Sequence, residues 1–164
     1  MRVIRTLTVG AALCLLCVGL TNTASAKELI VVASKATYEA SQKWVDFLTL
    51  HEVPLKHITP QEFNKYKKSP FIVLMGGIDE PDGIMALAKE VLSEDEFRYI
   101  AQKGNGEMYL KFKVWDPMQT VIVFAGSDGA AAEAARKKNR KVWWDTFISW
   151  FDLDAEMGDQ FHEY

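Results

Sequence analysis

The sequence predicts an α/β fold: a three-layer sandwich in which helices cover both faces of a mainly parallel sheet. Three apolar runs, at 29–33, 71–75 and 121–125, show no alternation between apolar and polar side chains. Strands buried on both faces have this pattern, whereas strands with one solvated face alternate. Helical patterns separate the runs, and right-handed crossovers then give the core strand order 2-1-3-4.

The elements are expected in the order β-α-β-α-β-α-α-β-β-α. After the first run, Thr37 is expected to cap a helix that closes at His51. A short edge strand is predicted over 55–58. The sequence Thr-Pro-Gln-Glu at 59–62 then forms a capping box with proline at the first helical position, which predicts a short helix.

The second half of the chain continues this alternation of helices and strands. An apolar stripe over 84–91 and a capping box at 93–96 predict two helices. Residues 107–115 alternate with a period of two, which predicts a strand with one solvated face. They form either a hairpin with the strand over 121–125, giving one antiparallel strand, or an extended connection. Residues 126–129 start the last helix.

The first 26 residues have the pattern of a secretory signal peptide. Arg2 and Arg5 precede an uncharged apolar run over 7–20, and the Ala-Ser-Ala sequence at 24–26 fits cleavage before Lys27. The apolar run is shorter than the roughly 20 residues that a membrane-spanning helix needs. We therefore expect an exported protein, periplasmic or extracellular after cleavage.

The mature chain is expected to hold one α/β domain over 27–151 and an acidic, frayed tail over 152–164. Cys14 and Cys17 leave with the leader, which excludes a cysteine nucleophile, a cysteine-ligated zinc ion and an iron–sulfur cluster. The mature chain has 17 basic and 22 acidic residues, a net charge of −5. This balance gives no general attraction to nucleic acid.

A ligand crevice is expected where the strand order reverses, outside the carboxyl ends of the strands. Loops at 34–37, 76–83 and 126–129 would form its walls. Each loop opens a helix, so free N–H groups and positive helix ends favour an anion, but the acidic residues of the rim, Glu80 among them, argue against one. The residues predicted to bind a small polar ligand are Ser34, Lys35, Thr37, Gly76, Gly77, Asp79, Asp82, Ser127 and Asp128.

Several of these residues have structural explanations as well. Asp82 and Asp128 stand where helix caps belong. The pair Gly76-Gly77 suits a tight turn from strand to helix. The acidic loop could instead hold a hard cation such as Ca²⁺, although the spacing of Asp79 and Asp82 matches no calcium loop. No metal and no cofactor is predicted.

The sequence predicts no catalytic residue. It contains neither the G-x-S-x-G motif of serine hydrolases nor a phosphate-binding glycine motif. His51, His57 and His162 all fall outside the predicted crevice. An alternative is a small hydrolase that works through paired rim carboxylates such as Asp79, Asp82 or Asp128.

The aromatic segment at 142–151 is the densest feature of the chain. One interpretation is a terminal helix that packs on the sheet. The other is a surface for self-association or for a partner protein of the envelope, because large aromatic side chains are favoured at interfaces. The residues predicted for that surface are Trp143, Trp144, Phe147, Trp150 and Phe151. The basic run at 136–141 makes peripheral membrane contact a third possibility.

The chain contains the segments FIVLMGG at 71–77, VWDPMQ at 114–119 and VIVFAGSD at 121–128, with an alanine-rich helix after them. In these three segments and that helix it resembles small α/β domains of prokaryotic surface proteins. These are secreted and S-layer-associated proteins of unknown function. The resemblance implies an extracytoplasmic role in assembly or binding without an assigned catalytic residue. We therefore expect an exported, non-catalytic α/β binding or protein-interaction module of the cell envelope.

Overall fold

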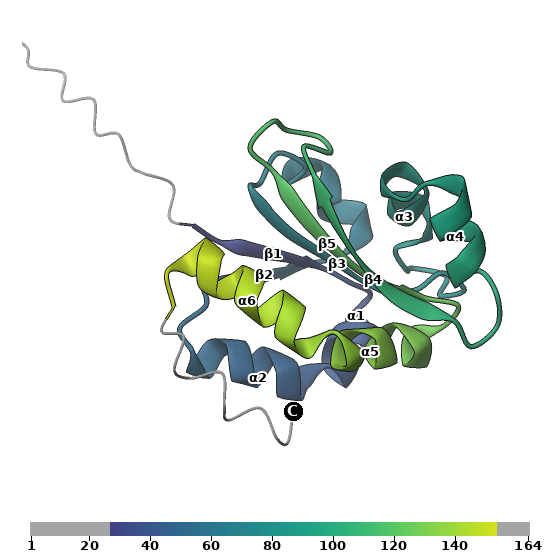
Figure 1. Ribbon diagram of the computed structural model, residues 1–164, viewed down its shortest axis with the longest axis horizontal. Helices are drawn as coiled ribbons and strands as arrows, with labels where there is room; N and C mark the ends of the chain where they lie inside the picture. Colours follow the sequence, from purple (N-terminus) through teal and green to yellow (C-terminus); the bar gives the residue numbers. More distant parts are fainter. Residues whose placement is uncertain (1–26, 154–164) are drawn as a thin grey trace, which may run out of the picture.

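The protein is described by a computed structural model that covers residues 27–153, in which helices pack on both faces of one sheet (Figure 1). The predicted signal peptide (1–26) and most of the predicted tail (154–164) lie outside the described residues. The strands are β1 (Leu29–Val32), β2 (Leu55–Ile58), β3 (Phe71–Gly77), β4 (Gly106–Phe112) and β5 (Thr120–Gly126).

The strands lie in the order β2-β1-β3-β5-β4. The pairs β1–β2, β1–β3 and β3–β5 are parallel, and β4 pairs with β5 in the antiparallel direction. This arrangement confirms the predicted α/β fold with a mainly parallel sheet. It also answers the open question about residues 108–114, because most of them lie in β4 and form the antiparallel edge strand beside β5.

Helices connect the parallel strands and follow β5. They are α1 (Lys35–Ala40), α2 (Gln42–Leu50), the 3-10 helix η1 (Pro60–Lys65), α3 (Met85–Val91), α4 (Glu94–Ile100), α5 (Gly129–Lys138) and α6 (Arg140–Phe151). Both predicted capping boxes are present. The Glu62 carboxylate accepts the N–H of Thr59 at 3.1 Å, and Glu96 accepts that of Ser93 at 2.8 Å.

Two predicted helices are each divided by one polar residue. The first begins at its N-cap Ser34 rather than at Thr37, and it breaks at Ser41 into α1 and α2. The last helix ends at Asn139, where the amide side chain donates to the Ala135 carbonyl at 2.9 Å, and α6 starts after it. At Asn139 the side chain that binds a helical carbonyl competes with the backbone hydrogen bonds, which favours the break there.

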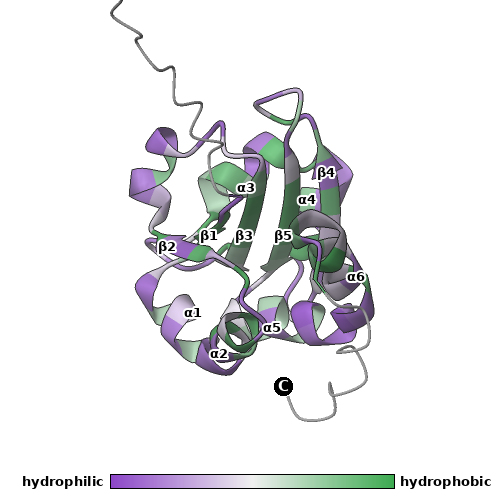
Figure 2. Cartoon of the chain, turned by 90° about the vertical axis from the view of Figure 1, so that its left-hand side faces the viewer, coloured by the Kyte–Doolittle hydropathy of each residue, from purple (hydrophilic) through white to green (hydrophobic). Residues whose placement is uncertain are grey.

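Each face of the sheet has its own core. On one face, alternate strand residues such as Val31, Val73 and Phe124 pack with the aromatic side chains of α2 and α6. On the other face, residues such as Val32 and Leu74 pack with η1, α3 and α4. Figure 2 shows β1, β3 and β5 as the hydrophobic middle layer between helices of mixed hydropathy. The uninterrupted apolar runs therefore correspond to strands buried on both faces, as predicted.

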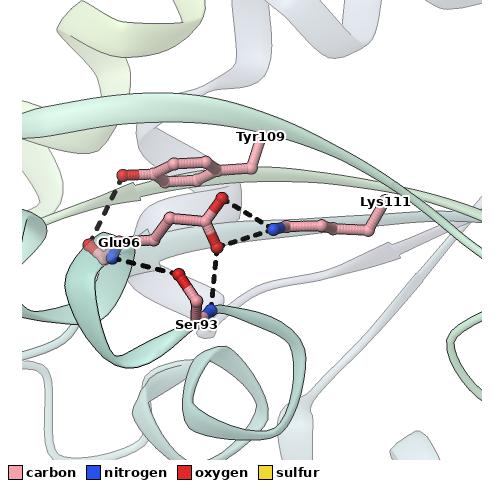
Figure 3. Close-up of polar contacts among 4 residues, drawn as sticks. All are labelled: Ser93, Glu96, Tyr109 and Lys111. Carbon is pink, nitrogen blue, oxygen red and sulfur yellow. Dashed lines mark hydrogen bonds and ion pairs between the residues drawn. The ribbon is translucent and has the colours of Figure 1, made fainter.

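The face of β4 that was expected to be solvated is instead covered by α4. The Lys111 ammonium contacts both carboxylate oxygens of Glu96, at 2.6 and 2.7 Å, and the Tyr109 hydroxyl donates to the Glu96 carbonyl at 3.4 Å (Figure 3). The same carboxylate accepts the Ser93 N–H. One glutamate thus closes the capping box of α4 and fastens that helix to the edge strand.

The glycine pair at the end of β3 allows two loops to approach closely, which corrects the prediction of a tight turn into α3. Residues 78–84 separate the pair from α3. A Cβ atom on Gly77 would lie 2.6 Å from the backbone carbon of Asp128, so only glycine fits between the ends of β3 and β5. Gly76 has a φ of +150°, a region that favours glycine.

Candidate functional site

A cleft of about 910 Å³ opens at the carboxyl edge of the sheet, between α1 and the start of α5. It lies beside the ends of β1 and β3, where the strand order reverses. Ligands of open α/β sheets bind at such points because the two crossovers diverge to opposite faces there. The lining residues are Ser34, Lys35, Ala36, Thr37, Glu39, Ala40, Ser41, Met75, Glu80, Pro81, Asp82, Gly129, Ala130, Ala132 and Glu133.

Four of the nine residues predicted to bind a ligand line this cleft: Ser34, Lys35, Thr37 and Asp82. The other five, Gly76, Gly77, Asp79, Ser127 and Asp128, are not among its lining residues. The two glycines end β3, Asp79 lies in the loop after it, and Ser127 and Asp128 follow β5. Several of them have structural contacts there.

The loop after β5 shows what those residues do in the fold. The Asp128 carboxylate accepts the N–H of Ala131 at 2.8 Å and caps α5, which is the structural role anticipated for it. The Ser127 hydroxyl accepts the N–H of Gly104 at 2.9 Å. Asp82, in contrast, caps no helix: Ile84 stands at the start of α3 and makes no side-chain cap bond. Asp82 is therefore an exposed acid on the rim of the cleft.

The central side chain of the cleft is Glu80, which was seen from the sequence only as one of several rim acids. Its carboxylate accepts the Ser34 hydroxyl at 2.7 Å, the Thr37 hydroxyl at 2.8 Å and the Gly77 N–H at 2.9 Å. The Ser34 oxygen also accepts the Thr37 N–H at 3.1 Å, so it caps α1 while it donates to Glu80. The loop after β3 thus folds back and places its own carboxylate against the start of α1.

This arrangement disfavours an anion in the cleft, in agreement with the acidic rim seen in the sequence. The hydroxyl and N–H groups that could bind an anion already donate to Glu80, and a second anion there would face an unfavourable like charge. Three further carboxylates line the cleft, those of Glu39, Asp82 and Glu133, against the single cation Lys35. Lys35 itself lies 3.7 Å from Glu39.

Glu133, on α5, is the second carboxylate of the cleft that is held in place by contacts within the chain. Arg136 is 2% exposed and makes two parallel bonds to the Glu133 carboxylate, at 2.6 and 2.8 Å. Burial acts to raise the pKa of Glu133, but the Arg136 guanidinium, helped by Lys137, holds that pKa below its usual value. The Arg136 guanidinium also lies 5.5 Å from the ring centroid of Trp44, a cation–π contact that fixes it from the core side.

The deep lining of the cleft is mostly apolar. Met75 and Ala132 are each 1% exposed, and Ala36, Ala40 and Ala130 line its walls. Ser41 is buried in the same lining, and its hydroxyl donates to the Met75 sulfur at 3.8 Å, a weak acceptor. A concave apolar surface with a few fixed polar groups is the usual character of a small-molecule site.

Neither histidine of the described residues lies in the cleft. His51 packs edge-on against Phe47 at the end of α2, and burial lowers its pKa. His57 stacks on Tyr38 with ring centroids 3.9 Å apart. His162 lies outside the described residues. Within residues 27–153, no group of three histidine, cysteine, aspartate or glutamate side chains could hold a metal ion.

The aromatic side chains of α6 are buried within the chain. Trp143, Trp144, Phe147 and Trp150 pack on the sheet against α2, and Phe151 is half-buried at the end of the helix. Their burial matches the alternative of a terminal helix packed on the sheet. It leaves the prediction of an interaction surface without the exposed aromatic side chains on which it was based.

The basic run upstream is largely paired with acids. Lys137 lies 3.4 Å from Glu133, Lys138 lies 3.2 Å from Glu107, and Lys141 lies 2.7 Å from Asp145. These pairs reduce the positive potential available to an anionic surface. Over the part of the chain that the structure describes, no helix is both long and apolar enough to cross a membrane.

Comparison with known proteins adds no further constraint on the site. No protein-family model, no curated protein and no solved structure matches this chain.

Proposed function

We propose that the protein is an exported, non-catalytic α/β binding module of the cell envelope that holds a small ligand in the cleft between α1 and α5. The observation that supports this proposal most strongly is the cleft itself. It has about 910 Å³ of space, an apolar deep lining and a fixed polar rim at the switch point of the sheet. Export and an envelope location rest on the leader-like first 26 residues and on the resemblance to prokaryotic surface proteins.

The polar groups of the cleft favour binding over catalysis. A carboxyl group that acts as a general acid needs a raised pKa, as in glycoside hydrolases. The pKa of Glu133 is instead lowered, because Arg136 outweighs its burial. Glu80 is tied to three donors of the chain itself. These contacts suit groups that hold a ligand in place, and a hydrolase through rim carboxylates is the alternative that an activity assay addresses.

A protein partner would have to use a surface other than the aromatic face of α6, since Trp143 and Phe147 lie in the core. Peripheral membrane contact would likewise depend on lysine residues that are already paired with acids. Binding of a small ligand is therefore the function that the geometry supports best, and binding of a partner protein or a membrane surface has less support.

A screen of small molecules with the purified protein tests the proposal. Ligand-observed NMR would find binders, and backbone resonances of α1 and α5 would place them. The variant Ala130→Trp adds a large side chain at an exposed lining position, and we expect it to abolish binding. Ala134→Trp is the matched control, because Ala134 is exposed on the same helix but does not line the cleft. Binding that survives Ala130→Trp, or a screen without any binder, would contradict the proposal.

Export is tested separately by cell fractionation and N-terminal sequencing. We expect the protein in the periplasmic or extracellular fraction with Lys27 as its first residue. A chain that stays in the cytoplasm and keeps its first 26 residues would contradict the envelope location while leaving the binding function open to the NMR screen.

A further inference from the structure

We infer that the cleft selects a small organic cation, an ammonium or guanidinium group on an apolar body. This inference rests on the proposed function, since it names the class of ligand for the same cleft.

The donors of the cleft are already used within the chain. The hydroxyls of Ser34 and Thr37 and the N–H of Gly77 all donate to Glu80. Lys35 is close to Glu39 on the outer wall. A ligand that needs donors from the protein, such as a carboxylate or phosphate, would have to displace Glu80 from three hydrogen bonds.

The acceptors, in contrast, are incompletely matched. Glu39 and Glu133 each have a cation within 4.0 Å. Glu80 has only neutral donors and forms no ion pair with any residue of 27–153, and neither does Asp82. Two neighbouring carboxylates without a counter-cation therefore face the same space. A partly buried carboxylate gains most from a charged donor, because charge-assisted hydrogen bonds are the strong ones.

Ser41 adds a polar group to the deep lining of the cleft. It is 5% exposed and lines the cleft, and its hydroxyl has only the Met75 sulfur as an acceptor at 3.8 Å. Within the described residues no group donates to its oxygen. The hydroxyl oxygen keeps lone pairs, which a ligand N–H can use. Ser41 sits beside the apolar lining, so it marks where the body of the ligand ends and a polar group begins.

The cation is expected to be organic rather than a metal ion. Calcium takes six to eight oxygen ligands, and no group of three metal-ligating side chains exists within residues 27–153. The buried Met75 and Ala132 in the lining would contribute nothing to an inorganic ion. They suit a hydrocarbon body, which gains from leaving water.

A matched set of three probes tests the inference: hexylammonium, hexanol and hexanoate, which share one body and differ in charge. Titrations of the purified protein would be followed by NMR at the resonances of α1 and α5. We expect hexylammonium to bind about tenfold more tightly than hexanol, the effect of one charge-assisted hydrogen bond, and hexanoate to bind most weakly. The preference should shrink as the salt concentration rises.

The variant Glu80→Gln removes the charge and keeps one acceptor oxygen, which can accept the Ser34 and Thr37 hydroxyls while the amide NH2 replaces the oxygen that accepts the Gly77 N–H. We expect it to bring the ratio of the affinities for hexylammonium and hexanol down to about one, and this ratio separates the loss of charge from any change in the shape of the cleft. Asp82→Asn, at an exposed position that forms no ion pair with any residue of 27–153, should lower the preference in part. Glu94→Gln, on the exposed surface of α4, is the control and should change neither affinity.

The outcomes separate this inference from the proposed function. Cleft binding in which hexanol or hexanoate equals or exceeds hexylammonium would overturn the choice of a cation and leave the binding function standing. The same holds if CaCl₂, and not hexylammonium, shifts the α1 and α5 resonances. If none of the probes binds, the inference fails, and the wider NMR screen then decides the proposed function on its own.

Discussion

Replacing Phe147 by alanine tests whether α6 belongs to the core of a single chain. Phe147 is 0% exposed, and its ring centroid lies 5.4 Å from that of Trp143 and 5.3 Å from that of Trp150. Large-to-small changes of this kind cost about 3–5 kcal/mol in a closed core. That is a large part of the roughly 5–15 kcal/mol by which small domains are stable, so the urea midpoint should fall steeply.

The control is Val142→Ala on the same helix, because Val142 is 51% exposed and should change stability by about 0.5 kcal/mol at most. Unfolding would be followed by circular dichroism at two protein concentrations, alongside size-exclusion chromatography. A midpoint that depends on protein concentration would indicate that α6 is stabilised by a second copy. A loss below about 1 kcal/mol for Phe147→Ala would likewise refute the packing argument.

Three further predictions follow from local contacts. Burial opposes ionisation of Glu96, but the Lys111 ammonium holds the pKa of the Glu96 carboxyl below its usual value. The ionised carboxylate therefore contributes its full stability above about pH 4.5, and this contribution is lost as the pH falls through the lowered pKa. The difference in unfolding free energy between wild type and Glu96→Gln should therefore shrink in acid. Burial and the Glu96 charge raise the pKa of Tyr109 to about 12, so an ultraviolet titration should show a phenol with a pKa of about 12 that Tyr109→Phe removes. Stability should decrease as the pH rises from about 10 to about 12, because Tyr109 ionises first in the unfolded chain. Gly77→Ala should cost about 1–3 kcal/mol in urea unfolding, because its Cβ would meet the Asp128 backbone; an unchanged midpoint would contradict the close approach.

The sheet was largely predictable because its signal is local. The runs at 29–33, 71–75 and 121–125 are apolar on both sides, and this property alone indicates strands between two layers. The pairing of residues 108–114 could not be predicted from the sequence. An alternating pattern is the same whether the segment pairs with β5 or forms an extended connection. Its cover by α4 depends on the ion pair between Glu96 and Lys111, which joins residues 15 positions apart.

The site was predictable in place but not in composition. Topology alone brings Ser34, Thr37 and Asp82 to the cleft. Glu133 was missed because it stands within an alanine-rich helix, although its position four residues after Gly129 puts both on one helical face. The path of the loop after β3 decides which rim acid folds inward, and no pattern in the sequence distinguishes Glu80 from its neighbours Asp79 and Asp82.

The polarity of a switch-point cleft does not follow from its topology. Helix starts and strand ends always bring N–H and hydroxyl donors to this edge, and these donors bind any carboxylate that reaches them, including one of the chain itself. Once Glu80 has taken the donors of Ser34, Thr37 and Gly77, the free groups of the cleft are acceptors. A fold that commonly binds anions at this edge is thereby adapted to ligands of the opposite charge by one side chain in one loop. The charge preference of the cleft should accordingly depend on residue 80 more than on any helix that surrounds it.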